Sequence, residues 1–232
     1  MRIDILTLFP EMFAPLSASV IGRAVFGGKA EIVITDIRDY TLDKHKKCDD
    51  TPFGGGAGMV MTAQPIASAI EAVDPEHKAK RIYLSPKGRV FNQSVVKEYA
   101  ALDRILLLCG HYEGVDQRVI DLYIDEELSI GDYVLTGGEI PALAVADAVL
   151  RYVDGVINSD SLLQESFTGG LLEYPQYTKP REFKGLTVPE VLISGNHEKI
   201  DEWRKEQAEK ITRKNRPDLL SRESGGADGK GD

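Results

Sequence analysis

The 232-residue sequence is poor in several features that mark particular classes of protein. It has only two cysteines, Cys48 and Cys109, which are far apart in the sequence and match no disulfide or metal-binding pattern. No apolar run approaches the roughly 18 residues that a membrane-spanning helix needs. The first residues, MRID, enter a strand-like pattern at once, without the features of a signal peptide. We therefore expect a cytoplasmic protein without a membrane partner.

The chain also lacks the excess of positive charge that is typical of proteins that bind nucleic acids. Its 28 Lys and Arg residues against 37 Asp and Glu residues give a formal charge of −9. The charge is uneven, because residues 1–175 hold 16 basic and 26 acidic side chains whereas residues 176–217 hold 10 and 7. An acidic body therefore carries a mildly basic C-terminal segment, which is compatible with a nucleic-acid partner.

Common catalytic motifs are absent as well. The sequence has no G-x-x-x-x-G-K-[ST] phosphate-binding loop and no G-x-S-x-G nucleophile elbow. The glycine-rich stretch FGGGAGM (53–59) follows a charged loop instead of a strand, so it does not match a dinucleotide-binding fingerprint. The four histidines have no zinc-ligand spacing, and we assign no role to His111. These absences argue against nucleotide hydrolysis, Ser/His hydrolase chemistry and a structural metal.

Alternating apolar patterns predict an α/β sheet. Strands are expected near 3–8, 31–37, 81–84, 104–108 and 126–130, with helices over 12–24, 66–73 and 140–151 between or after them. Beyond Pro180 the strand pattern ends, and Ile200, Trp203, Gln207 and Ile211 share one helical stripe. The expected organisation is a first domain over 1–160, a linker over 161–180, a helical domain over 181–217 and a disordered tail over 218–232.

Three glycine-containing loops follow consecutive predicted strands. They are LSPKG (84–88), CGHYEG (109–114) and SIGDYVLTGGEIP (129–141). Each loop alone is more often an ordinary turn, but open α/β sheets bind ligands at the carboxyl ends of their strands. Tyr112, Tyr133, Ile130 and Leu135 could form the walls of an adenine site in these loops. The pattern therefore predicts a ligand site there.

Longer segments resemble one known family. LSPKG (84–88), CGHYEGVDQR (109–118), SIGDYVLTGGEIPA (129–142) and QESFTGGLLEYPQYTKP (164–180) are similar to bacterial tRNA (guanine-N1)-methyltransferases, and the similarity covers roughly residues 1–217. The resemblance implies a SPOUT-type α/β fold, in which a parallel sheet contains a deep trefoil knot, plus a small helical C-terminal domain. It also implies a homodimer and methyl transfer from S-adenosylmethionine to N1 of guanine 37 in the anticodon stem-loop of tRNA.

The resemblance assigns the three loops to the cofactor. Glu113 could favour the positively charged end of S-adenosylmethionine, or could act only as an acidic residue at a helix N-terminus. Magnesium dependence has been suggested for this family, but the sequence contains no readable cluster of metal ligands. The implied cofactor-binding residues are Leu84, Ser85, Pro86, Gly110, Tyr112, Glu113, Gly114, Ser129, Ile130, Gly131, Asp132, Tyr133, Val134, Leu135, Gly137, Gly138 and Pro141.

Methylation at N1 requires two further groups. N1 of guanine carries a proton, so a general base must remove it, and negative charge then develops on O6. Arg151 matches the family's arginine and is the implied partner of O6, although it could instead be a helix C-terminal charge. At the position of the base the family has Asp, whereas this chain has Glu165. We interpret Glu165 as the base; Asp160 in its place and a slow enzyme are the alternatives.

The basic C-terminal segment supplies candidate contacts to RNA phosphates. Any one of these side chains could equally be part of a solvated helix face. Two other functions stay open, namely a knotted methyltransferase that acts on a ribose 2′-hydroxyl and a non-catalytic RNA-binding protein with the same fold. The candidate RNA-binding residues are Lys179, Arg181, Lys184, Arg204, Lys205, Arg213, Lys214 and Arg216.

Overall fold

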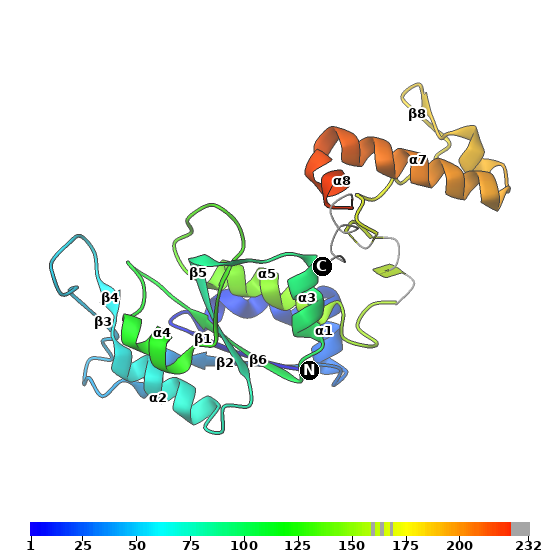
Figure 1. Ribbon diagram of the computed structural model, residues 1–232. Coiled ribbons are helices and arrows are strands. Elements are labelled where there is room, and N and C mark those ends of the chain that lie inside the picture. The colour runs from blue at the N-terminus through cyan, green and yellow to red at the C-terminus, as the bar shows by residue number, and fades with distance from the viewer. Residues whose placement is uncertain (159–160, 163–164, 168, 224–232) are drawn as a thin grey trace, which may run out of the picture. The chain divides into compact units, whose positions relative to one another are not determined.

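The computed structural model describes residues 1–158, 161–162, 165–167 and 169–223 (Figure 1). The chain divides into two compact units, residues 1–158 and residues 159–232. Among the described residues, no helix combines the length and the apolar character needed to cross a membrane.

The first unit is built on a five-stranded sheet in which all neighbouring strands run parallel. The register is regular at the centre, where Ile5 pairs with Ile34 on one side and with Leu107 on the other. This arrangement confirms the expected α/β class with a parallel sheet. The strands lie in the order β2 (Glu31–Asp36), β1 (Arg2–Thr7), β6 (Arg104–Cys109), β5 (Lys80–Val90) and β7 (Glu126–Ser129).

Helices cover both faces of this sheet (Figure 1). Strand β6 reads RILLLC and is apolar on both sides, because Ile105 and Leu107 belong to one buried cluster while Leu106 and Leu108 belong to the other. Each of these fully buried side chains contributes about 1.5–3 kcal/mol of hydrophobic stabilisation. The first cluster includes η1 (Pro10–Ser17), α1 (Ser19–Phe26), α3 (Gln93–Ala100) and α5 (Glu139–Leu150); the second includes η2 (Ile37–Tyr40), α2 (Ala63–Val73) and α4 (Gln117–Tyr123).

Two elements of the first unit differ from the sequence-based expectation. The single helix expected over 12–24 is a 3-10 helix followed by α1, because Pro15 has no N–H to donate and Ser19, the first residue of α1, adopts a φ of 58°. The strand expected over 81–84 continues to Val90, with an irregularity in its pairing with β7 between Leu84 and Arg89. The LSPKG segment is therefore an irregular part of a strand and not a loop after one.

Buried ion pairs join the amino ends of the strands. Asp74, which is 1% exposed, accepts a hydrogen bond of 2.9 Å from Nε of Arg81 and lies 3.5 Å from Arg104. Burial alone would raise the pKa of Asp74, but hydrogen bonds from the backbone of Lys78, the Arg81 guanidinium and the backbone of Ala79 hold it below its ordinary value. The amino ends of these strands are thus held together by charge pairing, at the opposite end of the sheet from the predicted ligand site.

The second unit contains a two-stranded hairpin, β8 (Glu182–Phe183) with β9 (Leu186–Thr187), then η3 (Glu190–Ile193), α7 (His197–Asn215) and α8 (Pro217–Glu223). The hairpin is a correction, since no strand was expected beyond Pro180; its strands are too short to give an alternating pattern. Helix α8 is a second correction, because residues 218–223 of the expected disordered tail are helical, with Asp218 in the first turn. Residues 224–232 of that tail lie outside the described residues.

Candidate active site

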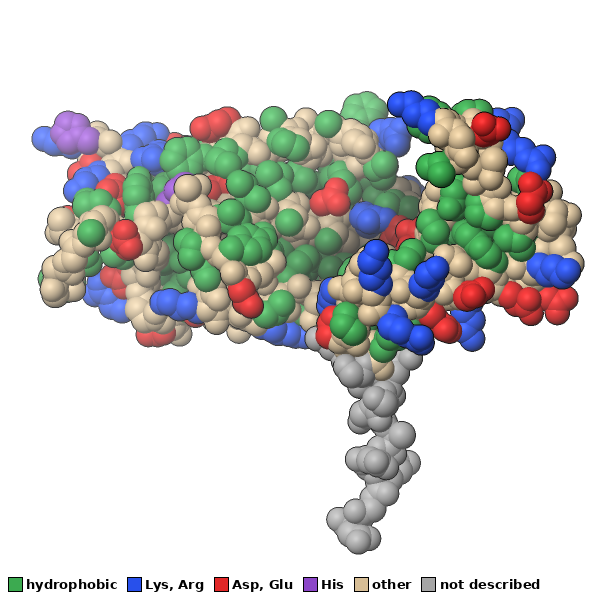
Figure 2. Space-filling view, turned by 90° about the horizontal axis from the view of Figure 1, so that it is seen from above, with side chains coloured by type: hydrophobic (Ala, Val, Ile, Leu, Met, Phe, Trp, Pro, Cys, Tyr) green, Lys and Arg blue, Asp and Glu red, His purple; other side chains and the backbone are tan. Residues whose placement is uncertain are grey.

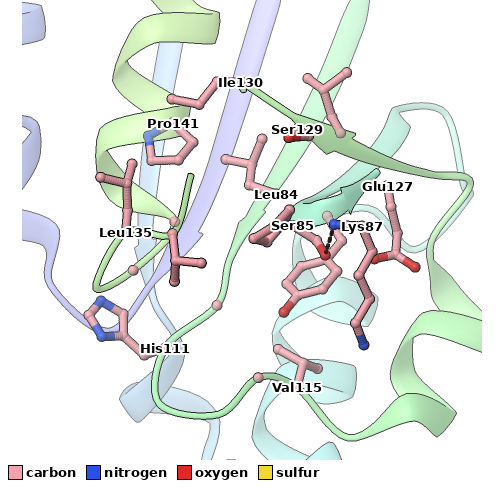
Figure 3. Close-up of a pocket in the computed structure, with 18 of the residues that line it drawn as sticks. Leu84, Ser85, Lys87, His111, Val115, Glu127, Ser129, Ile130, Leu135 and Pro141 are labelled. Carbon is pink, nitrogen blue, oxygen red and sulfur yellow. Dashed lines mark hydrogen bonds between the residues drawn. The ribbon is translucent and has the colours of Figure 1, made fainter. Parts of the chain in front are cut away.

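A cavity of about 350 Å³ lies between the irregular part of β5 and the loops that follow β6 and β7 (Figure 3). All of the predicted cofactor-binding residues except Asp132 line this cavity, although they come from three separate parts of the sequence. The structure thus brings together the segments near 84–87, 110–114 and 129–141. Asp132 is exposed and is not among the lining residues.

Glycines allow the second and third loops to meet backbone to backbone. The N–H of Gly138 donates a hydrogen bond of 2.8 Å to the carbonyl of Gly110. A Cβ atom on Gly138 would lie 2.6 Å from the Cα of Cys109, and one on Gly110 would lie 2.8 Å from the Tyr83 hydroxyl. Since the facing atoms at Gly138 are backbone, the loops can meet in this way only with glycine there, whereas a side chain at Gly110 would require the Tyr83 ring to move.

The cavity has an apolar side and a polar side. In Figure 3 the side chains of Ile130, Leu135 and Pro141 lie on one side, and those of Lys87 and Glu127 lie on the other. The apolar side suits a flat ring system, whereas the polar side offers one cation and one carboxylate. A ligand with a ring at one end and charges at the other therefore matches this cavity.

Several lining residues were not predicted from the sequence. Lys87 lies within the quoted LSPKG motif and is the only Lys or Arg that lines the cavity in the described part of the chain. Glu127 precedes the third loop, on strand β7. His111 lies inside a quoted motif, but it lacked a recognisable partner in the sequence. The other additional lining residues are Tyr83, Val115, Gln117, Ile120, Leu128 and Thr136.

Glu139, the first residue of α5, is a buried hydrogen-bond partner of His111. Its carboxylate is 1% exposed and lies 2.7 Å from Nε2 of His111 and 2.6 Å from the hydroxyl of Thr7, at the end of β1. The His111 ring also packs against Phe9, with 4.7 Å between ring centroids. Burial raises the pKa of the adjacent Cys109 thiol well above its ordinary value, and Glu139 raises it further.

The glycine-rich stretch packs beside the second loop. It connects β3 (Asp49–Asp50) to β4 (Val60–Met61), and the N–H of Glu113 donates a hydrogen bond of 2.9 Å to the carbonyl of Met59. Gly58, with a φ of 80°, lies so close to the Glu113 side chain that a Cβ would be 2.5 Å from its carboxylate oxygen. The acidic residue that caps α4 is Asp116, which accepts from the N–H of Arg118 at 3.0 Å. Glu113 is therefore not that helix's N-terminal acid.

The two residues expected to act on guanine belong to different units. Arg151 is the C-cap of α5 in the first unit, where its backbone N–H donates to the carbonyl of Asp147 at 3.2 Å. Glu165 is half-buried in the second unit, and the hydroxyl of the next residue, Ser166, accepts from the N–H of Glu173 at 3.0 Å. The alternative base, Asp160, lies outside the described residues.

Several of the candidate RNA-binding side chains have acidic or aromatic neighbours within the second unit. Figure 2 shows basic and acidic side chains interspersed over the second unit. Arg204 lies 3.3 Å from Asp201 and 5.0 Å from the ring centroid of Tyr174. The remaining candidates are exposed or only half-buried. Arg181 pairs with Glu190, Arg216 pairs with Asp218, and Lys184 lies over the Phe183 ring. Arg213 and Lys214 line a shallow hollow with Glu206 and Glu209, while Lys179 and Lys205 lie at the surface.

Across the described residues, no three His, Cys, Asp or Glu side chains gather in a way that could hold a metal ion. The arrangement of these side chains thus gives no support to the magnesium dependence suggested for the family.

Comparison with known proteins identifies relatives over nearly the whole chain. A family model described as tRNA (Guanine-1)-methyltransferase TrmD matches residues 1–222. A protein of Clostridium botulinum (strain 657 / Type Ba4) named tRNA (guanine-N(1)-)-methyltransferase is 55% identical over 223 residues, which is 96% of this chain and 92% of the relative. A protein of the same name from Clostridioides difficile (strain 630) is 54% identical over 227 residues, 96% of this chain and 98% of the relative. The chain belongs to the tRNA (guanine-N1)-methyltransferase family.

Proposed function

We propose that the protein transfers a methyl group from S-adenosylmethionine to N1 of guanine 37 in tRNA, next to the anticodon. One observation carries the proposal: residues from three separate segments, predicted to bind the cofactor, line a single cavity at one edge of the parallel sheet. The names of the curated relatives, which specify tRNA and guanine N1, support the reaction and the atom that is methylated.

The cavity fits the chemistry of S-adenosylmethionine. This cofactor has an adenine ring, a positively charged sulfonium and an amino-acid end with one ammonium and one carboxylate. The apolar side formed by Ile130, Leu135 and Pro141 suits adenine, while Glu113 and Glu127 suit the positive groups and Lys87 suits the carboxylate. When bound there, S-adenosylmethionine supplies an electrophilic methyl group.

In the proposed reaction, Glu165 removes the proton from N1 of guanine and Arg151 stabilises the negative charge on O6. A carboxylate accepts the proton without help, provided that it lies within hydrogen-bond reach of N1. A guanidinium carries a fixed positive charge and two adjacent N–H donors, which suits a developing oxyanion. The longer Glu side chain reaches one methylene further than the Asp of other family members, so its backbone must sit correspondingly further away.

The proposal includes the fold details that belong to the family. We propose that the loops that meet at Gly110 and Gly138 are part of a trefoil knot in a SPOUT domain over 1–160, followed by a linker over 161–180. The helical domain over 181–217 then contacts the anticodon stem-loop through its basic residues. A homodimer would place the C-terminal domain of one subunit over the cofactor of the other.

The reaction is tested with labelled S-adenosylmethionine and tRNA transcripts that differ only at position 37. We expect methylation of the guanine-37 transcript at N1 and none when guanine 37 is replaced. Label on a ribose 2′-hydroxyl would favour the second class of methyltransferase, and RNA binding without any transfer would favour a non-catalytic protein. Either result contradicts the proposal.

The base is tested by the substitution Glu165→Gln. We expect turnover to fall by at least about 100-fold, because loss of a general base costs roughly that much or more, while the Kd for S-adenosylmethionine stays unchanged. Glu173→Gln is the matched control, since this nearby carboxylate accepts from the side-chain amide of Gln176 and has no proposed role in proton transfer. Unchanged turnover of Glu165→Gln would place the base elsewhere.

A further inference from the structure

The buried carboxylate of Glu139 joins three segments that meet at the cavity. It begins α5, contacts Thr7 at the end of β1, and contacts His111 in the loop after β6. Neither Glu139 nor Thr7 lines the cavity, whereas His111 does. Burying a carboxylate that is 1% exposed costs free energy unless it is hydrogen-bonded, so Glu139 needs its hydrogen bonds to Thr7 and His111.

The hydrogen bonds around Glu139 favour one arrangement of donors and acceptors. The Thr7 hydroxyl accepts a hydrogen bond of 2.9 Å from the N–H of Phe9, so its single hydrogen is available to donate to Oε1 of Glu139 at 2.6 Å. An ionised carboxylate has only acceptors, and the start of a helix favours its negative charge. Nε2 of His111 lies 2.7 Å from Oε2, and beside an ionised Glu139 it is the donor of this hydrogen bond.

The same pair sets the distance between the two cavity loops. A Cβ atom on Gly137 would lie 2.2 Å from Nε2 of His111 and 2.5 Å from Oε2 of Glu139, so the backbone of the third loop rests directly against the pair. His111 and Gly137 also form an isolated antiparallel bridge. A rotation of the His111 ring would therefore displace both loops.

We infer that Glu139 is a positioning residue for the cofactor cavity: it holds His111 as the Nε2–H donor and thereby fixes the two loops that enclose the ligand. The inference rests on the proposed function, because S-adenosylmethionine is the proposed ligand. The groups beside the pair are the Thr7 hydroxyl, the Tyr112 ring, whose centroid is 6.0 Å from that of His111, and the Phe9 ring, which in turn lies under the guanidinium of Arg38. The Cys109 thiol is also close enough for Glu139 to raise its pKa.

The proton arrangement is tested without any ligand. In the full-length protein labelled with ¹⁵N-histidine, the spectrum of His111 is assigned by comparison with the His111→Asn variant. We expect Nε2 of His111 to be protonated at pH 7.5, as a donor to Glu139. An unprotonated Nε2 would overturn the inference. Because this measurement needs no cofactor, its outcome is independent of whether the protein binds S-adenosylmethionine.

The effect on the cavity is tested by calorimetry with S-adenosylmethionine. For Glu139→Gln and Thr7→Val we expect the Kd to rise at least about tenfold, while Thr7→Ser, which keeps the hydroxyl, restores binding to within about threefold of wild type. Asp74→Asn is the matched control, since Asp74 is an equally buried carboxylate at the opposite edge of the sheet; we expect lower stability with an unchanged Kd. Wild-type affinity in both test variants would overturn the inference, whereas a wild-type protein that binds no S-adenosylmethionine would contradict the proposed function instead.

Discussion

Replacing Gly138 by Ala tests whether the cavity depends on direct backbone contact between two loops. The added Cβ would lie 2.6 Å from the Cα of Cys109, whereas ordinary contacts begin at 3.4 Å, so the backbones must separate by about 0.8 Å. That shift would stretch the 2.8 Å hydrogen bond from Gly138 to Gly110 to about 3.6 Å, beyond hydrogen-bond range. Overpacking costs about 1–3 kcal/mol and the lost hydrogen bond about 1 kcal/mol more.

We therefore expect Gly138→Ala to lower the free energy of unfolding by about 2–4 kcal/mol. The Kd for S-adenosylmethionine should rise at least tenfold, because about 1.4 kcal/mol of loop displacement is enough for that factor. Urea denaturation measures the first effect and calorimetry the second. Gly27→Ala is the control, since the added Cβ there lies 3.1 Å from the Arg23 carbonyl oxygen and 3.8 Å from that of Ala24, and we expect a change below about 1 kcal/mol. Wild-type stability and affinity in Gly138→Ala would refute the proposed loop contact.

Three further predictions follow from other contacts. Thr212→Val removes the buried hydroxyl that accepts a hydrogen bond of 2.8 Å from the N–H of Leu172. We expect the free energy of unfolding to fall by about 1–3 kcal/mol. Turnover should also be slower at an unchanged Kd for the cofactor, and Thr212→Ser is the control. The pKa of Asp74 is lower in the folded than in the unfolded protein, so its stabilising effect is present above about pH 4 and is lost as the pH falls through the folded value. In urea denaturation between pH 6 and pH 3, the free energy of unfolding of Asp74→Asn should therefore fall less steeply than that of the wild type. Lys87→Met should weaken binding of S-adenosylmethionine but leave binding of 5′-methylthioadenosine, which has no carboxylate, unchanged in calorimetry; equal weakening of both would contradict the proposed role of Lys87.

The sequence was sufficient to predict the five strands of the parallel sheet and the cavity-forming segments, because both have local signals. Ile105 to Leu108 are apolar without interruption, which is typical of a strand that is covered on both faces. The glycines at 110 and 138 mark places where backbones approach closely. The order of the strands in the sheet, however, depends on pairing between β1 and β6, about 100 residues apart, and no local pattern reports it.

The contacts that hold the site together were not predictable for the same reason. Glu139 reads as an ordinary first-turn acid of a helix, and Thr7 reads as the polar end of a strand. Only the fold places them within hydrogen-bond distance of each other, 132 positions apart in the chain. For the basic residues of α7, the sequence pattern indicated contacts to phosphate but not the neighbours within the protein. The structure places Asp201 and the Tyr174 ring beside Arg204, within the same unit.

The contact between Gly110 and Gly138 also limits how the pocket can change under selection. At Gly138 any substitution introduces a side chain where backbone atoms of the facing loop already lie, and at Gly110 it introduces one against the Tyr83 ring. A compound that occupied the pocket through hydrogen bonds to that main chain would leave few routes to resistance by point mutation. Resistance mutations would be concentrated at Lys87 and Glu127, the side chains on the polar side of the cavity, because their replacement leaves the contact between Gly110 and Gly138 intact.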